Sequence, residues 1–194
     1  MKPKILVILG STREGRRGEK VANWAMSVLS KRSDANFELV DLRDWDFPFY
    51  NLPTSPSTEK GMYQSEIQKK WGEKIESAEG FILITPEYNH GYPAVLKNAL
   101  DYLWFEWNHK PVVFISYGGL SGGIRAIEQL KQVVIELEMI PLIKSISIPR
   151  IKTLIDENGK FIEKSYDKKI ESLGKYITLW SKELKRIRKN IQPK

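Results

Sequence analysis

The sequence predicts an α/β protein of three layers, in which helices cover both faces of a five-stranded parallel sheet with the strand order 2-1-3-4-5. Two observations predict this class. Short apolar runs typical of buried strands recur along the chain, and segments with apolar residues at helical spacing alternate with them. No linker, repeat or low-complexity segment interrupts the alternation, so we expect residues 1–194 to form a single domain.

Five segments are expected to form the strands. Residues 4–9 read Lys-Ile-Leu-Val-Ile-Leu, a continuous apolar run that is typical of a strand buried on both faces. The other strands are expected at residues 37–42, 81–84, 111–116 and 140–148. Ligands bind at the carboxyl ends of parallel strands, so the loops after the first, third and fourth strands are expected to lie together around a site.

Apolar residues at helical spacing predict the intervening helices, including one at residues 62–78 and one at residues 94–107. Pro93 precedes the latter, and proline suits the first turn of a helix. The last helix has the clearest stripe. The same stripe would fit an isolated coiled coil, but the βα units before it favour packing on the sheet. It consists of Tyr166, Ile170, Leu173, Ile177, Trp180, Leu184 and Ile187.

Two connections have a predicted structure or role. Residues 43–60 form the longest irregular stretch and contain Pro48, Pro53 and Pro56. Loops of this length are commonly functional. Asn158-Gly159 separates two short apolar pairs and predicts the tight turn of a small hairpin.

The composition excludes several kinds of site. There is no cysteine, so disulfides, thiolate nucleophiles and cysteine-ligated metals are excluded. The sequence contains no His-x-x-x-His, so we expect no metal centre, and its two histidines offer little material for a hydrolase triad. No apolar run approaches the roughly 18 residues of a membrane span, and no signal peptide is recognisable. We expect a cytoplasmic protein that does not bind membranes.

The net charge of +7 is concentrated at the C-terminal end. Residues 182–194 contain six basic residues and one acidic residue, Glu183. Positive charge suits the C-terminal end of a helix. No nucleic-acid-reading motif accompanies this segment, so we do not expect nucleic-acid binding.

The loop after the first strand has the composition of a phosphate-binding turn. Residues 10–18 read Gly-Ser-Thr-Arg-Glu-Gly-Arg-Arg-Gly, and the following helix N-terminus offers N–H groups and partial positive charge. The loop begins like a Walker A motif, but Arg16-Arg17 stands where Lys-Ser/Thr is required. The G-x-G-x-x-G fingerprint of Rossmann NAD sites is also missing. A polar turn with solvated arginines is the alternative interpretation.

The loops after the third and fourth strands can line a planar ligand. Residues 85–93 read Thr-Pro-Glu-Tyr-Asn-His-Gly-Tyr-Pro. His90 in this loop has no identifiable carboxylate partner that would make it a general base, and Glu87 is expected to cap a tyrosine or helix N–H groups. Residues 116–123 contain two glycine pairs, which let backbone approach a ligand closely, although they also make simple turns. With so few candidate acids and bases, a bound cofactor is expected to carry the chemistry.

At these loops the chain resembles the NADPH-dependent FMN reductase family of the flavodoxin-like superfamily, with its quinone, azo and chromate reductase relatives. The resemblance rests on residues 10–16 with Val21-Ala22, on residues 85–101 and on residues 117–126. It implies a flavodoxin-like fold with FMN as cofactor and NADPH or NADH as reductant. It also implies ping-pong transfer of electrons to flavin, quinone, azo or similar small-molecule acceptors.

Carried over position by position, the resemblance implies an FMN site without a catalytic side chain. The phosphate would be held by Ser11, Thr12, Arg13, Arg16 and the backbone up to Gly18. The flavin and ribityl chain would be lined by Pro86, Glu87, Tyr88 and Asn89, and contacted from the other side by Ser116, Gly118 and Gly119.

Two further classes of protein would share this site: a non-enzymatic electron carrier of the flavodoxin type, and an FMN-binding regulatory protein. Such carriers are usually acidic, whereas this chain is basic. A homodimer or homotetramer is also expected, because the segment at residues 94–107 carries more aromatic side chains than one sheet-facing stripe can bury. They include Tyr102, Trp104 and Phe105.

Overall fold

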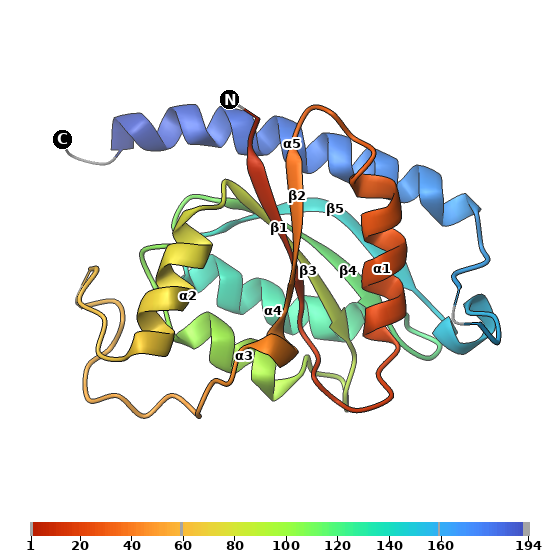
Figure 1. The fold of residues 1–194 in the computed structure, drawn as a ribbon, viewed down its shortest axis with the longest axis horizontal. Coiled ribbons are helices and arrows are strands. Elements are labelled where there is room, and N and C mark those ends of the chain that lie inside the picture. The colour runs from red at the N-terminus through yellow and green to blue at the C-terminus, as the bar shows by residue number, and fades with distance from the viewer. Residues whose placement is uncertain (1, 59, 159, 192–194) are drawn as a thin grey trace.

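A five-stranded parallel sheet runs through the molecule in the order β2-β1-β3-β4-β5 (Figure 1). The computed structural model describes residues 2–58, 60–158 and 160–191. The predicted class and strand order are confirmed. β3 and β4 are buried along their whole length, as their apolar sequences predict. The strands are β1 (Lys4–Leu9), β2 (Asn36–Asp41), β3 (Gly80–Pro86), β4 (Pro111–Tyr117) and β5 (Ile140–Ile148).

Helices cover both faces of the sheet (Figure 1). One face carries α1 (Gly18–Leu29) and α5 (Ser165–Ile191), and the other carries α2 (Glu66–Glu76), α3 (Ala94–Asp101) and α4 (Ile124–Glu136). Two short 3-10 helices, η1 (Leu42–Asp44) and η2 (Ile151–Leu154), follow β2 and β5. None of the helices that the structure describes is long and apolar enough to cross a membrane.

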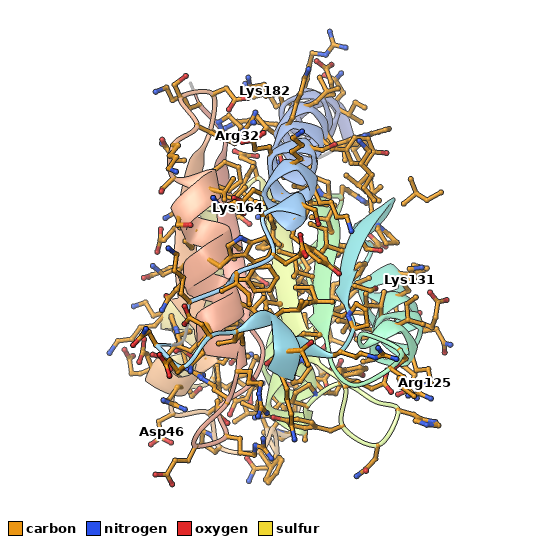
Figure 2. All side chains as sticks on the ribbon, turned by 90° about the vertical axis from the view of Figure 1, so that its right-hand side faces the viewer. Arg32, Asp46, Arg125, Lys131, Lys164 and Lys182 are labelled. Atoms are coloured by element: carbon orange, nitrogen blue, oxygen red, sulfur yellow. The ribbon has the colours of Figure 1, made fainter. Side chains whose placement is uncertain are left out.

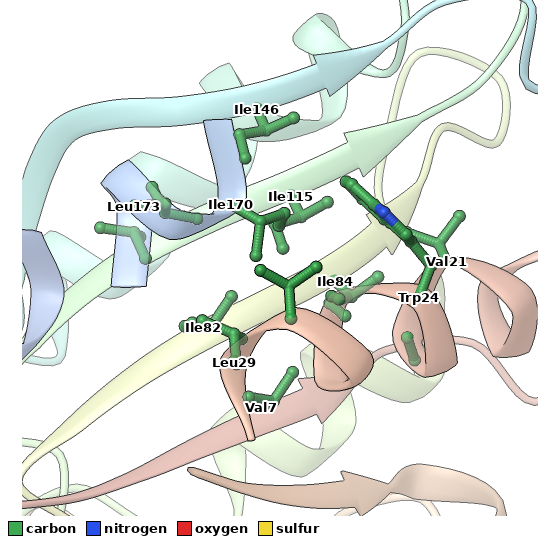
Figure 3. Close-up of a cluster of buried hydrophobic side chains, with 14 of the residues drawn as sticks. Val7, Val21, Trp24, Leu29, Ile82, Ile84, Ile115, Ile146, Ile170 and Leu173 are labelled. Atoms are coloured by element: carbon green, nitrogen blue, oxygen red, sulfur yellow. The ribbon is translucent and has the colours of Figure 1, made fainter. Parts of the chain in front are cut away.

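The core on the α1/α5 face joins three strands to both helices. Figure 3 shows Val7, Ile82 and Ile115 of neighbouring strands facing Leu29 of α1 and Ile170 of α5. All five side chains are fully buried, and burial of such a side chain contributes about 1.5–3 kcal/mol to stability. The last helix therefore packs on the sheet, as predicted, and not as an isolated coiled coil.

α3 ends at Asp101, well before the end predicted at residue 107. Tertiary hydrogen bonds explain the early end, because indole groups take up the last carbonyls of the helix. Trp71 Nε1 donates to the Ala99 carbonyl at 2.8 Å, and Trp107 Nε1 donates to the Leu100 carbonyl at 3.2 Å. Side chains thus satisfy the carbonyls that a helix leaves without intrahelical partners.

The proline-rich connection before α2 packs against the segment after α3. Phe47 and Tyr50 lie 4.8 and 5.3 Å from Tyr102, measured between ring centroids. Tyr102 is 3% exposed, and Trp104 and Phe105 are half-buried. The chain itself therefore covers much of the aromatic surface that suggested an oligomer, so this reason for expecting a second copy is weakened.

The structure also bears on two other predictions, the start of α2 and the turn before α5. α2 begins at Glu66, after the predicted start at residue 62, because the Ser65 hydroxyl accepts the Gln68 N–H at 3.2 Å and caps the helix. The predicted turn at Asn158-Gly159 includes Gly159, which lies outside the described residues. An antiparallel bridge joins Ile155 to Phe161 on either side of it.

Candidate functional site

A cavity of about 530 Å³ opens at the carboxyl ends of the strands, where parallel α/β sheets bind ligands. Its volume lies in the usual range for small-molecule sites. Three arginines of the β1–α1 loop form one part of its wall. Residues 86–88, 117–120 and 150–153 form the rest. The three loops predicted to meet are therefore brought together, and the segment after β5 joins them.

A second cavity, of about 570 Å³, lies between the proline-rich connection and helices α3 and α4. Its wall includes Pro53, Pro56 and Trp104, and its lysine, Lys97, already pairs with Asp101 at 2.5 Å. This cavity receives none of the three glycine- and arginine-bearing loops. The first cavity is therefore the candidate functional site, although it is slightly the smaller.

The β1–α1 loop brings two arginines to the N-terminus of α1. Arg13 is exposed, with its guanidinium carbon 5.8 Å from the ring centroid of Tyr88. Arg17 occupies the N-cap position of α1, and no described side chain caps this helix end. Among the described residues, neither arginine side chain forms an ion pair. The first N–H groups of a helix lack intrahelical acceptors, so this corner can hold a phosphate.

Arg16, a predicted phosphate contact, is bound by groups of the protein itself. Its side chain is 2% exposed, and its guanidinium binds both oxygens of Asp41, one of them at 2.7 Å, and the carbonyl of Ser11. Burial raises the pKa of Asp41, but the hydrogen bonds and charge of Arg16 outweigh burial and hold this pKa below its ordinary value. Arg16 therefore ties the loop to the end of β2, whereas Arg13 and Arg17 form no ion pair with any described residue.

Ser11 and Gly18 lie behind the cavity wall and support Tyr117. The Ser11 hydroxyl lies 3.2 Å from the Tyr117 hydroxyl. A Cβ at Gly18 would collide with the same hydroxyl and lie 2.8 Å from Leu9 Cδ1, so only glycine lets α1 begin this close to β4. Tyr117 lines the cavity, and sequence reasoning did not assign it. Burial raises the pKa of Tyr117 to about 12, so its hydroxyl stays protonated at neutral pH.

The β3–α3 loop ends in a tight hairpin. Tyr88 and Gly91 exchange two backbone hydrogen bonds of 2.8 and 2.9 Å. The residues between them, Asn89 and His90, have φ values of 49° and 70°, as in a type I′ turn. Both lie exposed at the tip and are not cavity-lining residues. Pro86 and Tyr88 do line the cavity.

Glu87 joins this loop to α4. Its carboxylate accepts the backbone N–H of Arg125 at 3.2 Å, Arg125 Nε at 2.7 Å and the Ser121 hydroxyl at 3.1 Å. The predicted helix-capping role is confirmed. Burial raises the pKa of Glu87, but these hydrogen bonds outweigh burial and leave the pKa below its ordinary value. Figure 2 shows Arg125 at the end of the molecule opposite Lys182, so the basic end of α5 lies away from this site.

The β4–α4 loop is held in shape from below by Ser116. This side chain is buried, and its hydroxyl donates to the Gly122 carbonyl at 2.7 Å, so it does not line the cavity. Gly123 has a φ of 87°, a backbone conformation that favours glycine. Gly118 and Gly119 are cavity-lining residues, as predicted for a ligand that approaches the backbone closely.

Residues 150–153, after β5, complete the cavity and were not assigned from the sequence. The Arg150 N–H donates to the Gly119 carbonyl at 2.7 Å, and the Ile151 N–H donates to the Gly118 carbonyl at 3.2 Å. Arg150 and Lys152 are exposed and line the cavity. The signal that could have found them is the fifth strand, whose predicted end at residue 148 puts the next residues at the same edge of the sheet.

The predicted cofactor residues thus fall into two groups. Seven line the cavity: Arg13, Arg16, Pro86, Glu87, Tyr88, Gly118 and Gly119. The others lie behind or beside its wall: Ser11, Thr12, Gly18, Asn89 and Ser116.

Comparisons with known proteins point to one family. The sequence profile of the NADPH-dependent FMN reductase family matches residues 3–152. An NAD(P)H-dependent FMN reductase of Schizosaccharomyces pombe is 43% identical over 152 residues, which cover 77% of this chain and 76% of the relative. An NADPH azoreductase of Bacillus sp. is 34% identical over 129 residues, 66% of each chain.

Solved structures show the same fold. The flavoenzyme NAD(P)H:(acceptor) oxidoreductase FerB of Paracoccus denitrificans has a TM-score of 0.71 at 23% identity, and the match covers 93% of this chain and 98% of that one. The fold is flavodoxin-like, with the sheet order described above. Since the family profile also spans most of the sequence, the chain belongs to the NADPH-dependent FMN reductase family.

Proposed function

We propose that this protein is an NAD(P)H-dependent oxidoreductase with FMN as its cofactor, and that it passes electrons to small-molecule acceptors such as quinones, azo compounds or free flavin. One observation carries the proposal. In a single cavity, an uncapped helix N-terminus flanked by Arg13 and Arg17 adjoins a space bounded by Tyr88 and by the backbone of Gly118 and Gly119. The names of the relatives, FMN reductase and azoreductase, support the same activity.

The residues present suit the two parts of FMN. Arg13, Arg17 and the first N–H groups of α1 would hold the phosphate, because they combine positive charge with hydrogen-bond donors. Pro86, Tyr88 and the glycine backbone would flank the flat ring system. When bound, FMN would supply the redox chemistry that carries electrons from the nicotinamide to the acceptor. Ser11, Thr12, Gly18, Asn89 and Ser116 would support these contacts from behind or beside the wall.

The side chains of the cavity bind and orient; they are not arranged to exchange protons. Tyr117, with its pKa raised by burial to about 12, stays neutral at physiological pH. Glu87 is ionised, and its charge is neutralised by Arg125. His90 lies at the hairpin tip, beside the cavity wall. This arrangement supports a mechanism in which the protein positions the rings and leaves the redox step to the cofactor.

The alternative of a non-enzymatic electron carrier is not favoured. The relatives are named as reductases, and the net charge of +7 differs from the acidic surface usual for such carriers. A regulatory FMN-binding protein would also share the site. Turnover separates both alternatives from an enzyme.

Steady-state oxidation of NADPH by the FMN-loaded protein, with and without a quinone, tests the proposal. In the absence of oxygen, which would itself reoxidise the flavin, we expect sustained consumption of NADPH to require both FMN and quinone. Arg13→Ala should need a higher FMN concentration for half-maximal rate. Lys175→Gln, which removes the same charge from an exposed position on α5, should behave as wild type. Tight FMN binding without sustained oxidation of NADPH would instead identify a carrier or a regulatory protein.

We further propose that residues 1–194 act as one cytoplasmic domain that assembles as a homodimer or homotetramer. Leu120 and Ile124 support the assembly, because they expose 81% and 51% of their surface beside the cavity. Exposed apolar side chains gathered at one place often mark interfaces. Light scattering at micromolar concentration should give the mass of a dimer or tetramer, and a monomer would contradict this part of the proposal.

A further inference from the structure

The cavity wall carries more positive charge than one phosphate needs. Four of its side chains are cations that make no ion pair with any other described residue: Arg13, Arg17, Arg150 and Lys152. We call these the open cations. The other charged groups of the wall are already neutralised, Arg16 by Asp41 and Glu87 by Arg125.

The open cations form two pairs, in segments that follow different strands. Arg13 and Arg17 belong to the loop after β1, whereas Arg150 and Lys152 follow β5. In the order β2-β1-β3-β4-β5, the strands β1 and β5 are three positions apart, which corresponds to about 14 Å at the usual strand spacing. FMN has a single phosphate, with a charge of about −2, and the first pair together with the N-terminus of α1 suffices to hold it. The second pair is therefore left for another anion.

Backbone hydrogen bonds fix the second pair in place. The N–H groups of Arg150 and Ile151 donate to the Gly119 and Gly118 carbonyls, and the Thr153 N–H and hydroxyl both donate to the Arg150 carbonyl at 2.9 and 3.0 Å. Arg150 has a φ of 49°, the left-handed region that favours glycine or asparagine. Arginine in this strained conformation, on the wall of a binding cavity, suggests that its side chain has a function.

We propose that Arg150 and Lys152 form a second phosphate subsite, which binds a phosphate of the reduced nicotinamide nucleotide while FMN occupies the rest of the cavity. The inference rests on the proposed function. The phosphate is either the 2′-phosphate that distinguishes NADPH from NADH or the pyrophosphate that both share. The two have the same chemistry, a multiply charged oxyanion that guanidinium and ammonium groups recognise.

Binding of the oxidised nucleotides, measured without turnover, tests the subsite. The FMN-loaded protein is titrated with NADP+ and separately with NAD+ in a calorimeter. The variants are Arg150→Asn, because asparagine tolerates the left-handed backbone, and Lys152→Gln. Arg150→Lys keeps the charge at the same backbone position, and Lys175→Gln is the control for loss of a surface charge. Thermal unfolding checks that each variant is folded.

We expect Arg150→Asn and Lys152→Gln each to raise the Kd for NADP+ about tenfold, and Arg150→Lys to restore most of the affinity. An unchanged Kd for NAD+ would identify the 2′-phosphate as the group that is bound, whereas an equal rise would identify the pyrophosphate. Unchanged affinity for both nucleotides would overturn the subsite.

The same samples keep this test separate from the proposed function. The FMN dissociation constant, measured from the quenching of flavin fluorescence, should be the same in these variants and in wild type. Wild-type protein that fails to bind FMN would contradict the proposed function. Wild-type protein that binds FMN and whose flavin is reduced by NADPH, but that binds neither oxidised nucleotide, would overturn only the subsite.

Discussion

Replacing Arg16 and Arg13 in turn should separate the stability of the β1–α1 loop from its affinity for phosphate. We expect Arg16→Met to destabilise the protein in the absence of FMN. We expect Arg13→Ala to leave stability unchanged and to weaken FMN binding. The two residues are close in sequence and carry the same charge, so each serves as the control for the other.

The structure sets the size of the first effect. Arg16 binds both oxygens of Asp41 and the Ser11 carbonyl, and the exposed fractions of the Arg16 and Asp41 side chains are 2% and 20%. Removing one partner of a buried ion pair costs about 3–5 kcal/mol. Water can reach part of Asp41, so we expect a loss of about 2–4 kcal/mol in the free energy of unfolding. In a domain of this size the Tm should fall by roughly 5–15 °C.

The second effect follows from the exposure of Arg13. A charge-assisted hydrogen bond is worth about 1.5–3 kcal/mol, and an exposed arginine should reach the lower end, about tenfold in the Kd for FMN. Thermal unfolding of the apoprotein and fluorescence titration with FMN measure the two quantities. The double variant Arg16→Met/Asp41→Asn should recover part of the lost stability, because it no longer leaves a partly buried carboxylate without its partner. An Arg16→Met protein with unchanged Tm and weakened FMN binding would refute the reasoning.

Three further predictions follow from the same geometry. Gly18→Ala should lower both the Tm and the affinity for FMN, because the added Cβ would displace the Tyr117 hydroxyl; thermal unfolding and FMN titration measure this. Initial rates with NADPH and a quinone varied together should give parallel double-reciprocal lines, and intersecting lines would contradict the ping-pong mechanism. His90→Ala should leave the rate of flavin reduction by NADPH nearly unchanged, and a much slower reduction would also contradict the mechanism. The pKa of Asp41 in the folded state lies below its ordinary value. Asp41 therefore stabilises the fold at pH values above the ordinary pKa, and this stabilisation is lost as the pH falls through the folded-state pKa. The stability difference between wild type and Asp41→Asn, measured by denaturant unfolding, should therefore be constant near neutral pH and disappear in acid.

Local sequence patterns were enough to predict the strands, their order and the meeting of three loops. The apolar runs of β3 and β4 can be buried on both faces only inside a parallel sheet covered by helices, which limits the choice of fold. The capping role of Glu87 was also predictable, because a carboxylate in a loop at the carboxyl edge of the sheet commonly meets helix N–H groups.

What could not be predicted depends on contacts between residues far apart in the sequence. An arginine in a glycine-rich loop is typical of a phosphate ligand, and only the pairing of β1 with β2 brings Asp41 to Arg16. The end of α3 likewise depends on Trp71 from α2, which takes a carbonyl that the local pattern assigns to the helix. Arg150 reaches the cavity because the chain after β5 turns back over the glycine loop.

The most direct test of the account is the reaction of the FMN-loaded protein with NADPH in the absence of oxygen, followed by addition of a quinone. We predict that the absorbance of the oxidised flavin is lost in proportion to the NADPH added and returns when the quinone is added. Protein that retains no FMN, or whose bound flavin does not change its absorbance with NADPH, would contradict the central claim.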